Sequence, residues 1–137
     1  MANCMQLEIV TPDKLLFSSD EIVYLGLRTN DGGIGIEANH IPVIASLDIA
    51  PMKYRLADGT DGYVAICGGF MERNANTCTI LATIAEMADD IDKARAEAAK
   101  ERAEERLKNK TENLDVNRAQ YSLRRAIARL GAYNKLG

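Results

Sequence analysis

Tryptophan is absent from this sequence of 137 residues, and aromatic residues make up only 5% of it. Since 47% of the residues are hydrophobic, the chain has enough apolar side chains for a core, and that core must be aliphatic. No apolar run approaches the roughly 20 residues that a helix needs to cross a bilayer. The segment Met1–Ile9 has no basic stretch followed by an apolar one, which is the pattern of a secretory signal. We therefore expect no signal peptide and no direct insertion into a membrane.

The chain also lacks an excess of basic charge and any paired cysteine motif. Its net charge is −3, which argues against nucleic acid as a partner, because binding to phosphate backbones needs clustered lysine and arginine. The three cysteines are an odd number, and no two of them have the spacing of a CxxC motif. Cysteines in strand-like sequence pack as small hydrophobic residues. The sequence therefore predicts a cytoplasmic protein whose thiols are structural.

Glycine and proline are missing from one long part of the chain. Eight of the ten glycines and all three prolines lie at or before Gly69, and neither residue occurs from Phe70 to Leu130. The earlier part has short apolar runs separated by Asp-Gly and Gly-Gly pairs. After about Ala88, alanine, glutamate, lysine and arginine recur at helical spacing. We predict two parts of an α+β protein, a β domain over residues 1–87 and a helical domain over residues 88–137.

The first part has many short apolar segments with frequent turns, which is typical of a β sandwich or barrel. Asn30–Gly33 predicts a tight turn, and Gly32–Gly35 lacks the spacing of a phosphate-binding loop. Two Asp-Gly pairs, at Asp58 and Asp61, predict the loop of a hairpin. The expected strands are 7–9, 14–17, 21–28, 52–56, 63–67 and 77–84.

The second part reads as two helices joined by a polar break at 109–113. The first begins near Asp90–Asp92, where carboxylates suit the positive end of the helix dipole. The second begins after Asp115 as N-cap and ends near Leu130, with Gly131 as its stop. The first helix offers mostly alanine to its partner, so we expect an antiparallel hairpin that is weakly held and can undock. The apolar stripes are Ile91, Ala94, Ala98, Ala99, Ala103 and Leu107 on the first helix, and Val116, Ala119, Leu123, Ala126, Ile127 and Leu130 on the second.

His40 is the only histidine and the first candidate for chemistry. An enzyme that used it with Asp31 or Glu37 would need a larger constellation of catalytic groups or metal ligands than the sequence offers. The sequence therefore favours a residue that structures a loop or forms a contact surface.

Four arginines of the tail are the second candidate. They converge if the two helices fold back on each other, and convergent guanidinium groups suit a polyphosphate because each can bind oxygens in a bidentate manner. From spacing alone, a solvated face balanced by glutamates is the more common arrangement. The arginines are Arg95, Arg102, Arg125 and Arg129, and the glutamates are Glu97, Glu101, Glu104 and Glu105.

Several short motifs occur along the whole chain in a specific order. They are Val10–Asp13, Gly35–Ile36, His40–Pro42, Gly68–Phe70 with Glu72, Thr79–Ala82, Ala85–Glu86 and Asp90–Asp92. As a set, they resemble the epsilon subunit of the F-type rotary ATP synthase. Two positions depart from the pattern of that family: Asn39 stands where glycine is frequent, and Arg73 stands where an apolar residue often follows the glutamate.

The resemblance implies a ten-stranded β sandwich followed by a two-helix hairpin. It implies a non-catalytic rotor subunit of the central stalk, which couples proton translocation to ATP synthesis at the cytoplasmic face of the bacterial cell membrane as a peripheral component. Its partners would be the gamma subunit and the ring of c subunits, and also the alpha and beta subunits when the hairpin extends and inhibits ATP hydrolysis. The loop expected to face the c ring carries Asp31, Glu37, His40 and Pro42.

Some bacterial members of this family bind ATP at the folded hairpin through the pattern Ile/Leu-Asp-x-x-Arg-Ala. Ile91, Asp92, Arg95 and Ala96 match this pattern. The resemblance thus implies no obligatory cofactor but a regulatory ATP site, with Asp92 accepting from the adenine amino group or fixing Arg95. The further residues expected at the site are Glu86, Arg102, Arg125 and Arg129. A free-standing nucleotide sensor is the alternative, and binding to isolated gamma subunit separates the two.

Overall fold

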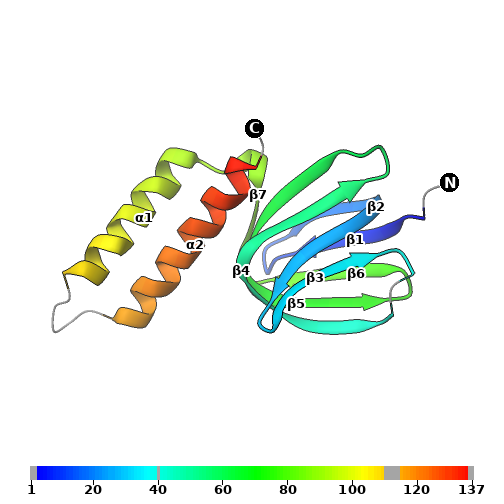
Figure 1. The fold of residues 1–137 in the computed structure, drawn as a ribbon, viewed down its shortest axis with the longest axis horizontal. Coiled ribbons are helices and arrows are strands. Elements are labelled where there is room, and N and C mark those ends of the chain that lie inside the picture. Colours follow the sequence, from blue (N-terminus) through cyan, green and yellow to red (C-terminus); the bar gives the residue numbers. More distant parts are fainter. Residues whose placement is uncertain (1–2, 40, 110–114, 136–137) are drawn as a thin grey trace.

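The computed structural model describes residues 3–39, 41–109 and 115–135 and consists of a β sandwich with a helical hairpin beside it (Figure 1). The predicted α+β class is confirmed. The sandwich contains strands β1 to β7, a short 3-10 helix η1 follows, and helices α1 and α2 form the hairpin. The elements are β1 (Met5–Val10), β2 (Leu15–Thr29), β3 (Gly32–Glu37), β4 (Val43–Leu56), β5 (Asp61–Asn74), β6 (Thr77–Ala82), β7 (Ala85–Met87), η1 (Ala88–Asp90), α1 (Lys93–Lys108) and α2 (Val116–Asn134).

The strands form one sheet that closes on itself. Its order is β1-β6-β5-β4-β2-β3, with β7 paired to β5. The first strand β1 runs parallel to β6 on one side and antiparallel to β2 on the other. This double pairing encloses an aliphatic core. The core contains Met5, Leu7, Ile9, Ile22, Leu25, Leu27, Ile36, Leu47, Met52, Val64, Ile66, Met71, Cys78, Ile80 and Ala82.

The described residues form seven strands, so the expected number of ten is wrong. The difference arises because β2, β4 and β5 contain 15, 14 and 14 residues, and because β2 and β5 change partners along their length. In β5, Gly68 and Gly69 have φ angles of 83° and 128°, which glycine adopts without steric cost, so the strand bends there instead of ending. A Cβ atom on Gly69 would lie 2.2 Å from the carbonyl oxygen of Leu81.

The tight turn predicted at Asn30–Gly33 is present at Asn30 and Asp31, whereas Gly32, Gly33 and Gly35 all lie in strand β3. Only Gly32, with a φ angle of 124°, serves the turn after Asp31. The ring of Tyr24 covers the opposite pair Gly26 and Gly35, and a Cβ atom on either glycine would lie 3.2 Å from the Tyr24 hydroxyl oxygen. A side chain at either position would force the Tyr24 ring to shift by a few tenths of an ångström.

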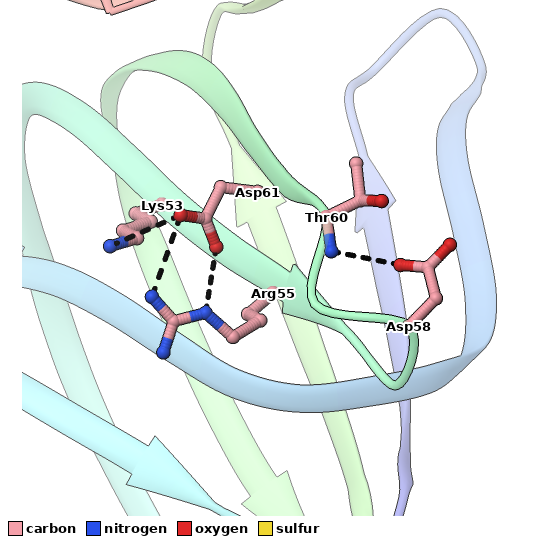
Figure 2. Close-up of polar contacts among 5 residues, drawn as sticks. All are labelled: Lys53, Arg55, Asp58, Thr60 and Asp61. Carbon is pink, nitrogen blue, oxygen red and sulfur yellow. Dashed lines mark hydrogen bonds and ion pairs between the residues drawn. The ribbon is translucent and has the colours of Figure 1, made fainter.

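The predicted hairpin near Asp58 is present as the connection between β4 and β5. Asp61 forms ion pairs with Arg55 at 2.8 Å and with Lys53 at 3.5 Å, and Asp58 accepts a hydrogen bond from the Thr60 amide (Figure 2). The hydrogen bond from Arg55 lowers the pKa of Asp61. These contacts lie at the surface and stabilise the strand pairing.

The second helix begins after its predicted N-cap Asp115, and the first, expected to start near Asp90–Asp92 with carboxylates in its first turn, begins after Asp92, which is its N-cap. Asp92 accepts a hydrogen bond from the Arg95 amide at 3.1 Å, and Asp115 accepts one from the Arg118 amide at 3.0 Å. The expected stop at Gly131 is wrong, because α2 continues to Asn134.

Gly131 is instead a point of close approach between α2 and the sheet. A Cβ atom at this position would lie 3.0 Å from the Cγ atom of Pro51 on β4. Because glycine has no side chain, the helix axis can approach the strand there.

The hairpin packs on the sandwich through α2. This helix contacts β4, β5, η1 and α1, so it lies between α1 and the sandwich (Figure 1). It buries Ala119, Ala126, Ala128 and Ala132.

The predicted apolar stripes are therefore partly wrong. On α2, Val116 and Ile127 keep 37% and 49% of their surface exposed. On α1, Ala96 and Ala103 are buried while Ala94 and Ala98 are exposed. The reason is that α2 lies between α1 and the sandwich and turns its alanines toward these two neighbours, which can then approach closely. Val116 and Ile127 are left on the side of α2 that faces solvent. No helix in the described parts of the chain is long and apolar enough to span a bilayer.

Candidate functional site: an arginine-lined groove in the hairpin

Two adjoining hollows between α1 and α2 form one groove, which we call the hairpin groove. Each hollow has a volume of about 360 Å³. Both contain Ala99, Arg102 and Arg129, so they are continuous. The first is also lined by Glu86, Asp90, Asp92, Arg95 and Ala96, and the second by Ala103, Arg106, Ser122 and Arg125.

The groove owes its open shape to alanines on the inner face of α1. Ala96, Ala99 and Ala103 follow one another at spacings of three and four residues, which places them on the same side of the helix. Their short side chains leave space between the two helices. Arginines on both sides of this row project around that space.

The arginines that line the groove are largely without negatively charged partners. Arg129 Nε lies 3.2 Å from Glu86 Oε1, and Arg125 donates a hydrogen bond to the Ser122 hydroxyl at 3.3 Å. Within residues 3–39, 41–109 and 115–135, Arg95, Arg102 and Arg106 form no ion pair. The groove is thus a concentration of positive charge that favours an anion.

Two of the four glutamates considered as counter-ions pair with lysines instead. Glu97 interacts with Lys93 at 3.9 Å, and Glu104 interacts with Lys100 at 3.8 Å, both along the surface of α1. Neither contact neutralises an arginine of the groove. This geometry weakens the solvated-face interpretation of the arginines.

Two residues of the Ile-Asp-x-x-Arg-Ala pattern have structural roles. Ile91 is buried in a small apolar cluster with Ala65, Ala88 and Ala132, where it joins the start of the hairpin to the sandwich. It does not line the groove. Asp92 binds the backbone amide of Arg95 and thereby fixes the first turn of α1 rather than the guanidinium group.

The sandwich contributes one wall of the groove. Glu86 lies on β7, which pairs with β5 in the register Ala65–Glu86. Its ion pair with Arg129 connects this strand to α2. A ligand in the groove would therefore contact three elements, β7, α1 and α2.

Cys67 of β5 lies beneath α2, close to this wall. Only 6% of its surface is exposed. Burial raises the pKa of the Cys67 thiol, and the nearby charges of Arg129 and Arg125 act in the opposite direction. Because Arg125 and Arg129 belong to α2, we expect the thiol to be protected while this helix stays in place.

Sequence reasoning missed Arg106, Asp90 and Ser122 as lining residues. A signal for Arg106 existed, because it lies four residues after Arg102, just as Arg129 lies four residues after Arg125. Nothing in the spacing singles out Ser122, since its place depends on how the two helices are aligned.

The expected contact loop is not one loop. Asp31 lies in the turn between β2 and β3, whereas Glu37 lies at the other end of β3, a strand of six residues and thus roughly 20 Å long. Pro42 is exposed just before β4. His40 lies outside the described residues.

The outer face of the sandwich carries exposed apolar side chains. Phe70 on β5 is 57% exposed and pairs with Leu81 on β6, which is 51% exposed. Ile44 on β4 is 76% exposed and pairs with Glu72 on β5. Neighbouring exposed side chains of this kind are typical of a surface that binds another protein.

Fold and groove together define a class: a small α+β protein whose β sandwich carries a helical hairpin with a cationic groove. Residues 4–88 match the family model of the ATP synthase Delta/Epsilon chain β-sandwich domain, and residues 89–134 match that of its long α-helix domain. The chain belongs to this ATP synthase delta/epsilon family, which confirms the resemblance found in the sequence. It is therefore an epsilon-type subunit and not a catalytic subunit of the complex.

Curated relatives are similar to this chain in sequence over almost their whole length. The ATP synthase epsilon chain of Syntrophomonas wolfei is 44% identical over 129 residues, which cover 94% of this chain and 93% of the relative. The epsilon chain of Natranaerobius thermophilus is 43% identical over 128 residues, with 93% and 90% covered. The same fold occurs in a chain of the Euglena gracilis mitochondrial ATP synthase, from a structure of OSCP/F1/c-ring. The TM-score is 0.80 at 20% sequence identity, and the match covers 98% of this chain and 82% of that one.

Proposed function

We propose that this chain is a central-stalk rotor subunit of an F-type ATP synthase, in which it couples proton translocation to ATP synthesis. We further propose that its hairpin inhibits ATP hydrolysis when extended and binds ATP when folded. The observation that carries the second proposal is the hairpin groove, where arginines of α1 and α2 meet without a full set of counter-ions.

The dimensions and chemistry of the groove suit a nucleotide. Its two hollows of about 360 Å³ each fall in the range of about 300–1,000 Å³ that small-molecule sites occupy. The cationic second hollow would hold the phosphates through Arg102, Arg125 and Arg129. The carboxylates of Glu86 and Asp90 in the first hollow are acceptors for amino and hydroxyl groups.

Binding at this place would act as a clamp. The groove exists only while α1 lies against α2, so a ligand that fills it binds the folded hairpin and not the extended one. Such a ligand shifts the equilibrium toward the folded form, by about 2.7 kcal/mol at a concentration 100 times its dissociation constant. A fall in the concentration of ATP would release α1. Among the helices and strands, α1 packs mainly against α2.

The sandwich is the part that we assign to the partners. Its exposed apolar residues Phe70, Leu81 and Ile44 suit the gamma subunit or the ring of c subunits. We keep Glu37, His40 and Pro42 as contacts to the c ring, with Asp31 as a separate contact. In this arrangement the chain is peripheral, at the cytoplasmic face of the bacterial membrane, and reaches the alpha and beta subunits only when the hairpin extends.

Titration of the purified chain with MgATP by calorimetry, with NMR on the same sample, tests the hairpin proposal. We expect saturable binding and new protection of amides in α1 and α2. Absence of binding would overturn the ATP clamp and leave the rotor role standing.

A free-standing nucleotide sensor remains the second candidate, because the groove by itself accounts for nucleotide binding. Binding to isolated gamma subunit distinguishes the two. A rotor subunit binds gamma with or without ATP, whereas a free-standing sensor binds ATP only.

A further inference from the structure

Ser122 lies one helical turn before Arg125 on α2, and both side chains line the second hollow of the hairpin groove. The Nη2 atom of Arg125 donates a hydrogen bond to the Ser122 hydroxyl oxygen at 3.3 Å. Arg129, one turn further along the helix, is held differently, because its Nε atom faces the Glu86 carboxylate at 3.2 Å. These two arginines of α2 therefore have separate anchors, one neutral and one charged.

The neutral anchor leaves the charge of its arginine available. A carboxylate partner neutralises a guanidinium group, so an incoming anion has to compete with Glu86 for Arg129. A hydroxyl group orients the guanidinium group of Arg125 and does not cancel its charge. Within the described parts of the chain, the second hollow is lined by no carboxylate and Arg125 forms no ion pair. Arg125 therefore keeps its full charge for an anion in this hollow.

The position of Arg125 depends on such an anchor, because Arg129 lies four residues away on the same helix. Like charges at this spacing repel each other, and the repulsion drives an unrestrained Arg125 side chain away from Arg129. A free arginine side chain also loses conformational freedom when it binds a ligand. The hydrogen bond to Ser122 reduces both penalties before a ligand arrives.

The Ser122 hydroxyl group also keeps a donor of its own. A serine oxygen has two lone pairs and one proton, and the bond from Arg125 uses one lone pair. In the part of the chain that the structure describes, the Ser122 proton has no acceptor. Because a hydroxyl group rotates to suit its partners, this proton can turn toward a phosphate oxygen that Arg125 binds.

We propose that Ser122 is a binding and positioning residue of the hairpin groove. Its oxygen holds the Arg125 guanidinium group in the second hollow, and its hydroxyl proton is donated to the same phosphate group of the ligand. This inference rests on the ATP site of the proposed function. It adds a residue that belongs neither to the Ile/Leu-Asp-x-x-Arg-Ala pattern nor to the arginines expected from the sequence.

The test compares Ser122→Ala and Ser122→Thr in the full-length chain, by calorimetric titration with MgATP at constant ionic strength. We expect Ser122→Ala to weaken binding roughly three- to tenfold, because a hydrogen bond and the restraint on Arg125 are lost. Ser122→Thr keeps the hydroxyl group and should bind within about twofold of the unmodified chain. A purely structural role predicts the opposite order, since alanine favours a helix more than serine does and threonine does not. Unchanged or tighter binding by Ser122→Ala, or equal losses in both variants, would overturn the proposal.

A control and a double variant separate the two roles of Ser122. Gln120→Ala is the matched control and should leave the affinity unchanged, because Gln120 is exposed on the same helix outside the lining of both hollows. In an Arg125→Ala background, Ser122→Ala should lose less affinity than it does alone, since the share that acts through Arg125 is already gone. NMR relaxation of the Arg125 Nε–H group should show more motion in free Ser122→Ala than in the free unmodified chain. Strictly additive losses, or equal motion in the two chains, would contradict a positioning role.

Tripolyphosphate, which has phosphate groups and no nucleoside, keeps failure of this inference apart from failure of the ATP site. If the unmodified chain binds tripolyphosphate but not MgATP, the nucleotide clamp is wrong, and the affinity of Ser122→Ala for tripolyphosphate decides the role of Ser122. If MgATP binds equally well to both chains, the clamp stands and the inference about Ser122 is wrong. If neither ligand binds the unmodified chain, both proposals are wrong.

Discussion

Arg124 on α2 forms an ion pair with Asp48 on β4, and the same carboxylate oxygen accepts a hydrogen bond from the Ile49 amide at 2.8 Å. The strand thus holds the acceptor in place for the helix. A second ion pair joins α2 to the sandwich, between Arg129 and Glu86. The ion pairs of α1 in the described chain are both internal to that helix. Attachment of the hairpin to the sandwich is therefore a property of α2.

We expect Asp48→Asn to loosen α2 and expose the thiol of Cys67. Because this ion pair is partly exposed, the change should be worth about 0.2–1 kcal/mol and raise the thiol-exchange rate by up to about fivefold. Exposure would also return the pKa of Cys67 toward its ordinary value and increase its thiolate fraction at pH 8. The rate is measured with an aromatic disulfide in a Cys4→Ala background, since Cys78 is completely buried. Lys100→Met, which breaks an ion pair within α1, is the control and should leave the rate unchanged.

The double substitution Arg125→Ala and Arg129→Ala should weaken MgATP binding by roughly 10- to 100-fold, because charged hydrogen bonds to phosphate are lost. Calorimetry measures the affinity. Arg28→Ala removes an arginine from β2, far from the groove in sequence and outside its lining, and should bind as the unmodified chain does. If the double variant binds MgATP as tightly as the unmodified chain does, the two arginines belong to a solvated face and not to a nucleotide site.

Gly131→Val should push α2 away from β4, since even a Cβ atom would lie 3.0 Å from Pro51 Cγ. We expect faster amide exchange in α2 and no change in the sandwich core. Pro51→Ala combined with Gly131→Val should recover part of the loss, because the contacting ring is gone, and a double-mutant cycle quantifies the recovery. Strictly additive effects would mean that the two residues do not interact.

Arg73→Met should stabilise the chain against unfolding by about 1–3 kcal/mol, because it removes a buried guanidinium group whose Nε atom has no hydrogen-bond partner, although the bond from its Nη2 atom to Asn76 Oδ1 is lost as well. Thermal and urea unfolding measure the change. Arg28→Met, at an exposed position, is the matched control, with an expected effect near zero. A destabilised Arg73→Met chain would show that the guanidinium group has favourable contacts beyond its bond to Asn76.

Deletion of residues 88–137 should leave a folded sandwich. The large aliphatic core lies wholly within β1 to β6, and the hairpin contributes no residue to it. Circular dichroism should show β structure and one cooperative unfolding transition. Loss of that transition would mean that the hairpin is needed for the sandwich to fold.

Local signals in the sequence were reliable where the structure depends on local chemistry. The predicted cap at Asp115 is correct, and the start expected near Asp90–Asp92 is close to the observed cap Asp92, because a carboxylate before a helix binds the amide three residues later. The convergence of arginines was also foreseeable, since an antiparallel hairpin places both helices side by side.

Long-range packing decided the features that the sequence did not reveal. Gly131 looked like a helix stop, but its absent side chain serves the approach to Pro51. The strand predicted over residues 63–67 continues as β5 to Asn74, because the chain bends at Gly69 without ending the strand. Ile127 belonged to the predicted stripe, yet it remains exposed because α2 packs on two sides. In each case the deciding neighbour is distant in sequence.

The double pairing of β1 has a consequence for how the chain acquires its shape during synthesis. Met5–Val10 can pair with the beginning of β2 as soon as that strand leaves the ribosome. Its parallel partner Thr77–Ala82 emerges only after more than half of the chain has been made. Until then the first strand has one open edge, so a nascent chain stalled before β6 should be a target for chaperones and for pairing with other strands.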